Sequence, residues 1–243
     1  MTQAATGTGL KRFSYERPLI GAESKAFARL AGSTVLDFSV QVVREASETD
    51  LGTDAATERL WLVLSGRARF TGGEGRALGE YGPLEGVHLP RGAPHRFAAV
   101  GDVDLEILHI AARDLGSGHA SQEQPDSITT VRYTSPDLGD NIKVTYILRE
   151  EDMLAVSVEK VRSGGGDDGL HTHTGTDSVW FVLSGGRVRF RTPEGMQLVL
   201  GPHEGLYVPR GAAYGFMALD EEAAEVLHVK ARDLTVANER IDY

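Results

Sequence analysis

The strongest constraint on this chain of 243 residues is an internal repeat. Four blocks recur in the same order, each 119 residues after its first copy (residue 57 to residue 176, for example), with no net insertion or deletion. Chance does not keep four blocks at one offset, so the sequence predicts two copies of one structural unit. The paired blocks are TERLWLVLSG (57–66) with TDSVWFVLSG (176–185), EG (85–86) with EG (204–205), PRGAPHRF (90–97) with PRGAAYGF (209–216), and LHIAARDL (108–115) with LHVKARDL (227–234).

Each copy has the pattern of β-strands. Short runs rich in β-branched and aromatic residues, such as WFVL (180–183) and QLVL (197–200), are separated by Gly and Pro turns. No long helical pattern interrupts them, which predicts an all-β sandwich or barrel in each copy. The Arg-Asp dipeptide at 113–114 recurs at 232–233 and is interpreted as a structural pair that closes each repeat.

The repeat divides the chain into four parts. Residues 1–22 are expected to form an N-terminal arm, either loose or an edge strand that crosses to a partner. Residues 23–115 form the first barrel and residues 128–243 the second. Residues 116–127 between them have no apolar periodicity and are interpreted as a linker.

Composition excludes several classes of function. The net charge of −10 argues against nucleic-acid binding, which needs clustered Lys and Arg. The absence of cysteine excludes disulfides and thiolate metal ligands. No segment predicts a membrane span or a secretory signal, so we expect a cytoplasmic protein without a membrane partner. The excess of Arg over Lys, with abundant Ala and Gly, is typical of GC-rich bacterial genomes.

Two motifs in the second copy resemble those of the cupin superfamily. The first runs from Gly165 through a His-x-His pair to Gly185, and the second reads Pro209-x-Gly211-x-x-Tyr214. A version without the His pair covers about residues 40–115, so nearly the whole chain is similar to a bicupin. The resemblance implies two tandem double-stranded β-helix (jelly-roll) barrels.

The resemblance also implies a divalent metal ion in the second barrel. Cupins typically hold it with His, His, Glu and His, and here His171 and His173 match the first two. Ser178 stands at the Glu position and Tyr214 at the last His position. Asp177 lies one residue early, where strand alternation points it away from the face of Ser178 unless a bulge re-aims it.

His228, on the closing strand, is the first choice for a third ligand, giving a site of three imidazoles. Tyr214 would then act as a hydrogen-bond donor or general acid, and His228 itself could serve in acid–base chemistry. A structural role for His228 is the alternative, since His109 holds the matching position in the first copy. Ser178, Trp180 and Tyr207 are candidates for the pocket wall, with core packing as the alternative for the two aromatic residues.

The first copy lacks the metal motif. Gly52 and Asp54 replace the His pair and Arg59 replaces the Glu, while His95 is retained. This pattern favours a structural barrel that has lost its site. The alternative is a second pocket in which Arg59, His95 and His109 bind a carboxylate.

These residues predict a metal-dependent enzyme acting on a small anionic or chelating organic molecule. Fe(II) and a dioxygenase-type oxidation with O₂ are favoured, because three imidazoles leave the metal its full positive charge. The first alternative is an isomerase or lyase using Zn, Mn or Ni, with Cu also compatible with the ligands. The second is a non-catalytic sensor that binds a small molecule. A homodimer formed through the N-terminal arm is a further expectation.

Overall fold

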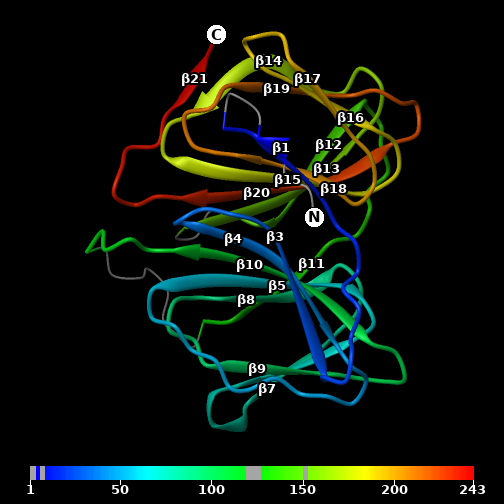
Figure 1. Ribbon diagram of the computed structural model, residues 1–243, viewed down its shortest axis with the longest axis vertical. Helices are drawn as coiled ribbons and strands as arrows, with labels where there is room; N and C mark the ends of the chain where they lie inside the picture. Colours follow the sequence, from blue (N-terminus) through cyan, green and yellow to red (C-terminus); the bar gives the residue numbers. More distant parts are fainter. Residues whose placement is uncertain (1–3, 6–8, 119–126, 150–152) are drawn as a thin grey trace. The chain divides into compact units, whose positions relative to one another are not determined.

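The computed structural model of the chain describes residues 4–5, 9–118, 127–149 and 153–243. The described residues form two compact units, one of residues 17–133 and one of residues 1–16 with 134–243. Both consist of antiparallel strands, and the only helical element in the described ranges is a short 3₁₀ turn (Figure 1). No helix in this part of the chain has the length and apolar character needed to cross a membrane.

The N-terminal unit contains two antiparallel sheets, of order β11-β8-β5-β10-β4-β3 and β7-β6-β9. Its core between them includes Trp61, Phe70 and Phe97. The elements are β3 (Lys25–Gly32), β4 (Leu36–Val43), β5 (Thr57–Ser65), β6 (Ala68–Gly72), η1 (Gly73–Gly75), β7 (Ala77–Tyr81), β8 (Glu85–Leu89), β9 (His95–Ala99), β10 (Leu105–Arg113) and β11 (Thr129–Arg132).

The C-terminal unit also contains two sheets, of order β1-β2-β18-β15-β20-β13-β12 and β17-β16-β19-β14-β21. Trp180, Phe190, Tyr214 and Phe216 fill the space between them. The strands are β1 (Ala4–Ala5), β2 (Lys11–Ser14), β12 (Ile142–Leu148), β13 (Leu154–Val161), β14 (Gly166–His173), β15 (Thr176–Ser184), β16 (Val188–Arg191), β17 (Gln197–Leu200), β18 (Glu204–Val208), β19 (Tyr214–Ala218), β20 (Ala224–Arg232) and β21 (Arg240–Asp242).

The sequence repeat is a repeat of strands. Its blocks form β5 and β15, β8 and β18, β9 and β19, and β10 and β20, each pair at matching positions. Gly66 and Gly185, which follow β5 and β15, have φ of 78° and 82°. A Cβ at Gly185 would lie 1.9 Å from the Ala223 carbonyl oxygen, so this turn requires glycine. The predicted all-β fold with two barrels is therefore confirmed.

Two short strands lie outside the divisions that the sequence suggested. Residues 11–14, expected in an arm, form β2 and pair with β18 of the C-terminal unit, where Phe13 stacks on Phe181. Residues 129–132, expected in the second barrel, form β11 and pair with β8 of the N-terminal unit. Backbone pairing of an edge strand carries no local sequence signal, which explains both differences. Most of the expected linker lies outside the described residues.

Each repeat is closed by an ion pair between two of its shared blocks. Arg91, in the turn before β9, donates to Asp114 at 2.7 Å, and both side chains are at least 90 % buried. Arg210 and Asp233 form the matching pair in the second copy. The Asp of the Arg-Asp dipeptide thus helps to close each repeat, but its partner is the arginine of the Pro-Arg-Gly turn and not the neighbouring arginine.

We expect Asp114→Asn to lower the free energy of unfolding of the N-terminal unit by about 3 kcal/mol, because it removes the counter-charge that Arg91 contacts inside the protein. Urea denaturation followed by circular dichroism measures the change. Arg113→Gln is the control, since that side chain is 61 % exposed and the substitution should cost less than about 0.5 kcal/mol. Equal effects of the two substitutions would contradict the role of the Arg91–Asp114 pair.

Candidate active site in the C-terminal barrel

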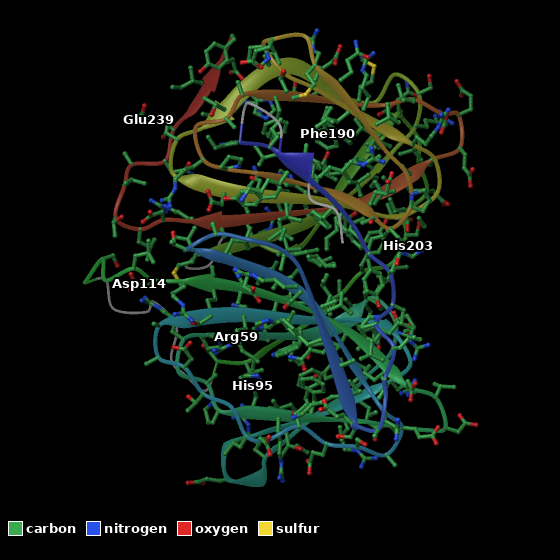
Figure 2. All side chains as sticks on the ribbon, viewed as in Figure 1. Arg59, His95, Asp114, Phe190, His203 and Glu239 are labelled. Carbon is green, nitrogen blue, oxygen red and sulfur yellow. The ribbon has the colours of Figure 1, made fainter. Side chains whose placement is uncertain are left out.

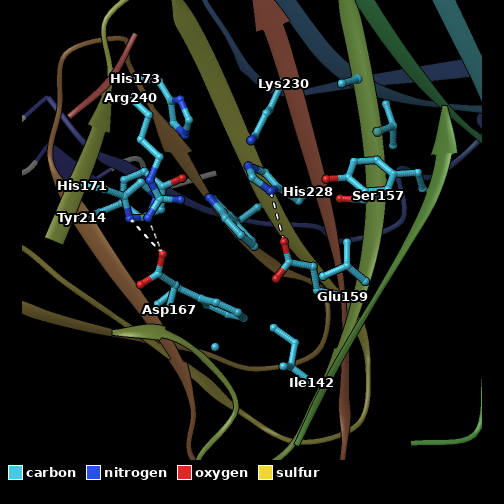
Figure 3. A pocket seen from close by; sticks show the side chains of 17 residues that line it. Ile142, Ser157, Glu159, Asp167, His171, His173, Tyr214, His228, Lys230 and Arg240 are labelled. Atoms are coloured by element: carbon cyan, nitrogen blue, oxygen red, sulfur yellow. Dashed lines mark hydrogen bonds and ion pairs between the residues drawn. The ribbon is translucent and has the colours of Figure 1, made fainter. Parts of the chain in front are cut away.

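A cavity of about 220 Å³ lies inside the C-terminal barrel. Five of the candidates from the sequence line it: His171, His173, Trp180, Tyr214 and His228 (Figure 3). Glu159, Lys230 and Arg240 also line it. The fold therefore gathers these residues from six strands, β13, β14, β15, β19, β20 and β21, around one small space.

β14 presents its two histidines on one face, because residues i and i+2 of a strand share a face. Their ring centroids are 5.6 Å apart, and the His171 ring lies 4.6 Å from the ring of Tyr214, its partner on β19. The Nδ1 atom of His171 lies 3.2 Å from the Gly169 carbonyl oxygen. Burial lowers the pKa of His171 and lowers the pKa of His173 to about 4. Both imidazoles are thus neutral near pH 7, the form that binds a metal ion.

His228 is held differently from the other two histidines. Its ring stacks on Trp180 with centroids 3.6 Å apart, and its Nδ1 atom lies 3.3 Å from Oε1 of Glu159. Burial holds the pKa of His228 well below its ordinary value. Its Nε2 atom is buried and has no hydrogen-bond partner among the described residues. That atom is the one polar position of His228 left for a ligand or a proton.

The N-terminal barrel has the same stack without a His pair. His109 lies on Trp61 with ring centroids 4.3 Å apart, and its Nδ1 atom is 3.4 Å from Asp37. A histidine that is stacked on tryptophan and held by a carboxylate therefore belongs to the barrel core of both units. This recurrence argues against His228 as a metal ligand, because the same arrangement exists in the barrel without the His pair.

The three histidines do not form one coordination group. Among the described residues, no group of three or more His, Cys, Asp or Glu side chains is placed to hold a metal ion. The neutral pair of His171 and His173 fits a metal, whereas His228 is committed to Glu159 and Trp180. A metal here would thus take two protein imidazoles and fill its remaining positions from Tyr214, water or substrate.

The Tyr214 hydroxyl is buried in the site. It has no hydrogen-bond partner within the described ranges, although Trp180 lies beside it. Burial raises the pKa of Tyr214, so the group stays protonated and can donate a hydrogen bond. A buried hydroxyl without a hydrogen-bond partner lowers the stability of the folded protein. Such a cost is expected where the hydroxyl binds a ligand.

Three candidate residues do not line the cavity. Asp177 accepts a hydrogen bond of 2.9 Å from the backbone N–H of Arg210 and points away from the cavity, as strand alternation predicts. Tyr207 lies under the Lys11 ammonium, 5.9 Å from its ring centroid. Ser178 is buried but is not among the lining residues. Instead Lys230, its cross-strand partner on β20, reaches the cavity and extends toward His228 (Figure 3).

Sequence reasoning missed Lys230, Glu159 and Arg240. The repeat contains a signal for Lys230, because a lysine stands where the first copy has Ala111. Glu159 likewise stands in a strand, β13, whose other residues are mostly apolar. Arg240 comes from the C-terminal strand β21, and its ion pairs with Asp167 and Asp242 have no signal in the sequence.

The residues of the second pocket do meet in the N-terminal barrel. Arg59, His95 and His109 line a cavity of about 590 Å³ there. His95 accepts a hydrogen bond of 3.0 Å from the Trp61 indole N–H at Nε2, and its Nδ1 lies 3.2 Å from the Ala93 carbonyl oxygen. Both nitrogens of His95 are therefore used within the fold.

No family model matches the sequence, and no curated protein is similar to it in sequence. Solved structures do match it. The protein Ylba from E. coli has a TM-score of 0.72 at 10 % identity, covering 94 % of this chain and 93 % of that one. A cupin 2 conserved barrel domain protein from Leptotrichia buccalis has a TM-score of 0.64 at 13 % identity, with 89 % and 92 % covered. The chain has a cupin fold.

Oxalate decarboxylase from Bacillus subtilis has the same fold, with a TM-score of 0.65 at 15 % identity over 94 % of this chain and 78 % of that one. That decarboxylase contains Mn(II) centres. At this identity the likeness concerns the cupin fold alone. The predicted fold class is confirmed. The chemistry of this chain has to be inferred from its own residues.

Burial raises the pKa of Glu159 to about 7 from 4.5, although the Lys230 charge opposes the shift. A raised carboxyl pKa adds stability below pH 4.5 that is lost as the pH rises through 7. We therefore expect Glu159→Gln to become more stable relative to wild type by about 3 kcal/mol between pH 4 and pH 8. Urea denaturation of chelator-treated protein at several pH values tests this. A difference that does not change with pH would contradict the burial of an ionisable Glu159.

Proposed function

We propose that the C-terminal barrel is the active site of a metal-dependent enzyme that acts on a small organic anion. The observation that carries the proposal is the cavity in which two neutral histidines, an unpartnered tyrosine hydroxyl and the Lys230 side chain converge. A few polar groups that converge in one cavity are the usual mark of a binding site. The likeness to oxalate decarboxylases, enzymes of the same fold, adds support.

His171 and His173 are the residues that would hold the metal. A divalent ion there would supply Lewis acidity, polarising a carboxylate or enolate oxygen of the substrate. The Glu of the motif would not share this ion, because Ser178 stands at its position. The positive charge of Lys230 and the donor hydroxyl of Tyr214 would orient the anion and stabilise charge that develops on its oxygen atoms.

Glu159 and His228 can move a proton at the same cavity. The Nε2 atom of His228 is unpartnered, and Nδ1 contacts Glu159, whose pKa is about 7. A proton taken from substrate at Nε2 would be balanced by transfer of the Nδ1 proton to the carboxylate. Groups whose pKa lies near the working pH are the most effective in such transfers. His228 thus acts here as an acid–base group, not as a metal ligand.

Within this proposal we favour Fe(II) with O₂ as co-substrate, because a metal with only neutral ligands keeps its full charge for an anionic substrate and O₂. A lyase, decarboxylase or isomerase using Mn, Zn or Ni is the alternative. It is supported by the proton-transferring pair of Glu159 and His228 and by the fold of the oxalate decarboxylases. Oxygen uptake in the presence of substrate separates the two.

The remaining expectations belong to the same proposal. We propose a bacterial, cytoplasmic bicupin whose partner is a small molecule, without nucleic acid or membrane partners. Dimerisation is part of the proposal too, although β2 pairs with β18 of its own chain. A non-catalytic sensor would bind the same anion without converting it.

We expect the purified protein to hold about one divalent metal ion per chain, and the double variant His171→Ala/His173→Ala to hold none. His228→Gln should keep the metal, because His228 is bound to Glu159 and Trp180. Elemental analysis after desalting measures all three proteins. Full metal content in the double variant would disprove the site, and loss of metal in His228→Gln would restore the site of three histidines.

We expect Lys230→Met to weaken the binding of oxalate, a small dianion, by at least about tenfold, because it removes a cation from a confined cavity. Isothermal titration calorimetry measures the dissociation constant. Lys160→Met is the matched control, since Lys160 contacts Ser135 and the Pro136 carbonyl and does not line the cavity. Equal affinities for wild type and Lys230→Met would contradict an anion site at Lys230.

A further inference from the structure

The N-terminal barrel contains the larger of the two cavities described above. Its volume of about 590 Å³ compares with about 220 Å³ in the C-terminal barrel. Its lining residues come from β3 and the segment before it, from β4, β5, β9 and β10, and from the loop between β4 and β5. Arg59 lies on β5 and His95 begins β9 of this unit (Figure 2). This barrel lacks the metal motif, so the function of its cavity must differ from that of the C-terminal cavity.

Arg59 is the buried charge of this cavity. It stands at the repeat position of Ser178, and its side chain is only 14 % exposed. The other charged residues of the lining, Glu23, Lys25 and Asp50, are exposed to solvent. Arg59 contacts Asp54 at 3.2 Å, and Arg113 reaches the same carboxylate at 3.9 Å. Because Arg113 also neutralises the Asp54 carboxylate, the Arg59 guanidinium can bind an anion in the cavity as well.

The histidines of this cavity do not offer a metal site. His95 is neutral, since burial lowers its pKa to about 4, and both of its nitrogens are used by Trp61 and Ala93. His109 contacts Asp37 and Ser39 through Nδ1. Its buried Nε2 atom has no partner among the described residues. The cavity therefore presents a guanidinium and one open imidazole nitrogen where the other barrel presents its His pair.

Part of the remaining wall is aromatic. Trp61 and Phe97 are buried in it, and Phe27 on the edge strand β3 is 56 % exposed. An aromatic side chain exposed on a cavity wall gains from contact with an apolar ligand. The two features together define the ligand: a carboxylate end that reaches Arg59 and an apolar body, such as a ring, that contacts Phe27 and Phe97.

We propose that the N-terminal barrel is a second binding site, which takes a small organic monocarboxylate with an apolar body and holds its carboxylate on Arg59. Guanidinium–carboxylate pairs are strong and directional when they are shielded from water. The site needs no metal and is independent of the function proposed for the C-terminal barrel. The sequence favoured a purely structural role for this barrel, whereas this proposal assigns a ligand to its cavity.

Isothermal titration calorimetry with benzoate and phenylacetate tests the proposal. The titrations use the full chain carrying Lys230→Met, so that the C-terminal cavity contributes little. We expect one site per chain, with Arg59→Gln weakening the binding of both probes by at least about tenfold. Arg69→Gln is the matched control, because Arg69 pairs with Glu80 at the surface and does not line the cavity. It should change affinity by less than about twofold.

Two further comparisons do not depend on the folding of Arg59→Gln. Benzamide has the shape of benzoate without its charge and should bind at least about tenfold more weakly. Asp54→Asn should leave benzoate affinity unchanged or raise it, because Asp54 competes for Arg59. Failure of both carboxylates to bind at about 10 mM would overturn the proposal. So would benzamide binding as tight as benzoate, weaker binding by Asp54→Asn, or unchanged binding by a folded Arg59→Gln.

Discussion

The stack of an imidazole on an indole is the interaction around which each barrel interior is built. In the C-terminal unit His228 lies on Trp180, whose ring also stacks against Phe216 at 4.7 Å. In the N-terminal unit His109 lies on Trp61 in the same way. A carboxylate holds each histidine at Nδ1, which leaves Nε2 as a polar atom inside an apolar core. A buried polar atom of this kind is costly unless a ligand or a reaction uses it.

The two barrels differ in what surrounds this shared core. The C-terminal barrel adds the His pair of β14 and the Lys230 side chain in a small cavity, which suits a metal ion and a small anion. The N-terminal barrel has Arg59 in place of Ser178 and a larger cavity with an aromatic wall. Duplication of one barrel thus leads to two cavities with different ligand chemistry, because a few interior side chains changed while the strands stayed the same.

The features that were predicted correctly from the sequence are those that local patterns determine. The repeat, the strands with their Gly turns and the His-x-His pair all follow from spacing along the chain, and alternation along β15 correctly pointed Asp177 away from Ser178. Contacts between distant strands were not predictable. Lys230 enters the site opposite Ser178, and Glu159 holds His228 across 69 residues of sequence. The pairing of β2 with β18 depends on backbone hydrogen bonds that any sequence can make.

Our central claim is that the C-terminal barrel holds a metal ion with two imidazoles and keeps its third histidine for proton transfer. X-ray absorption spectroscopy of the metal-loaded protein counts imidazole ligands directly from the scattering of their outer ring atoms. We predict two imidazoles and additional oxygen ligands, unchanged in His228→Gln. Three imidazoles in the wild-type spectrum, falling to two in His228→Gln, would contradict this claim.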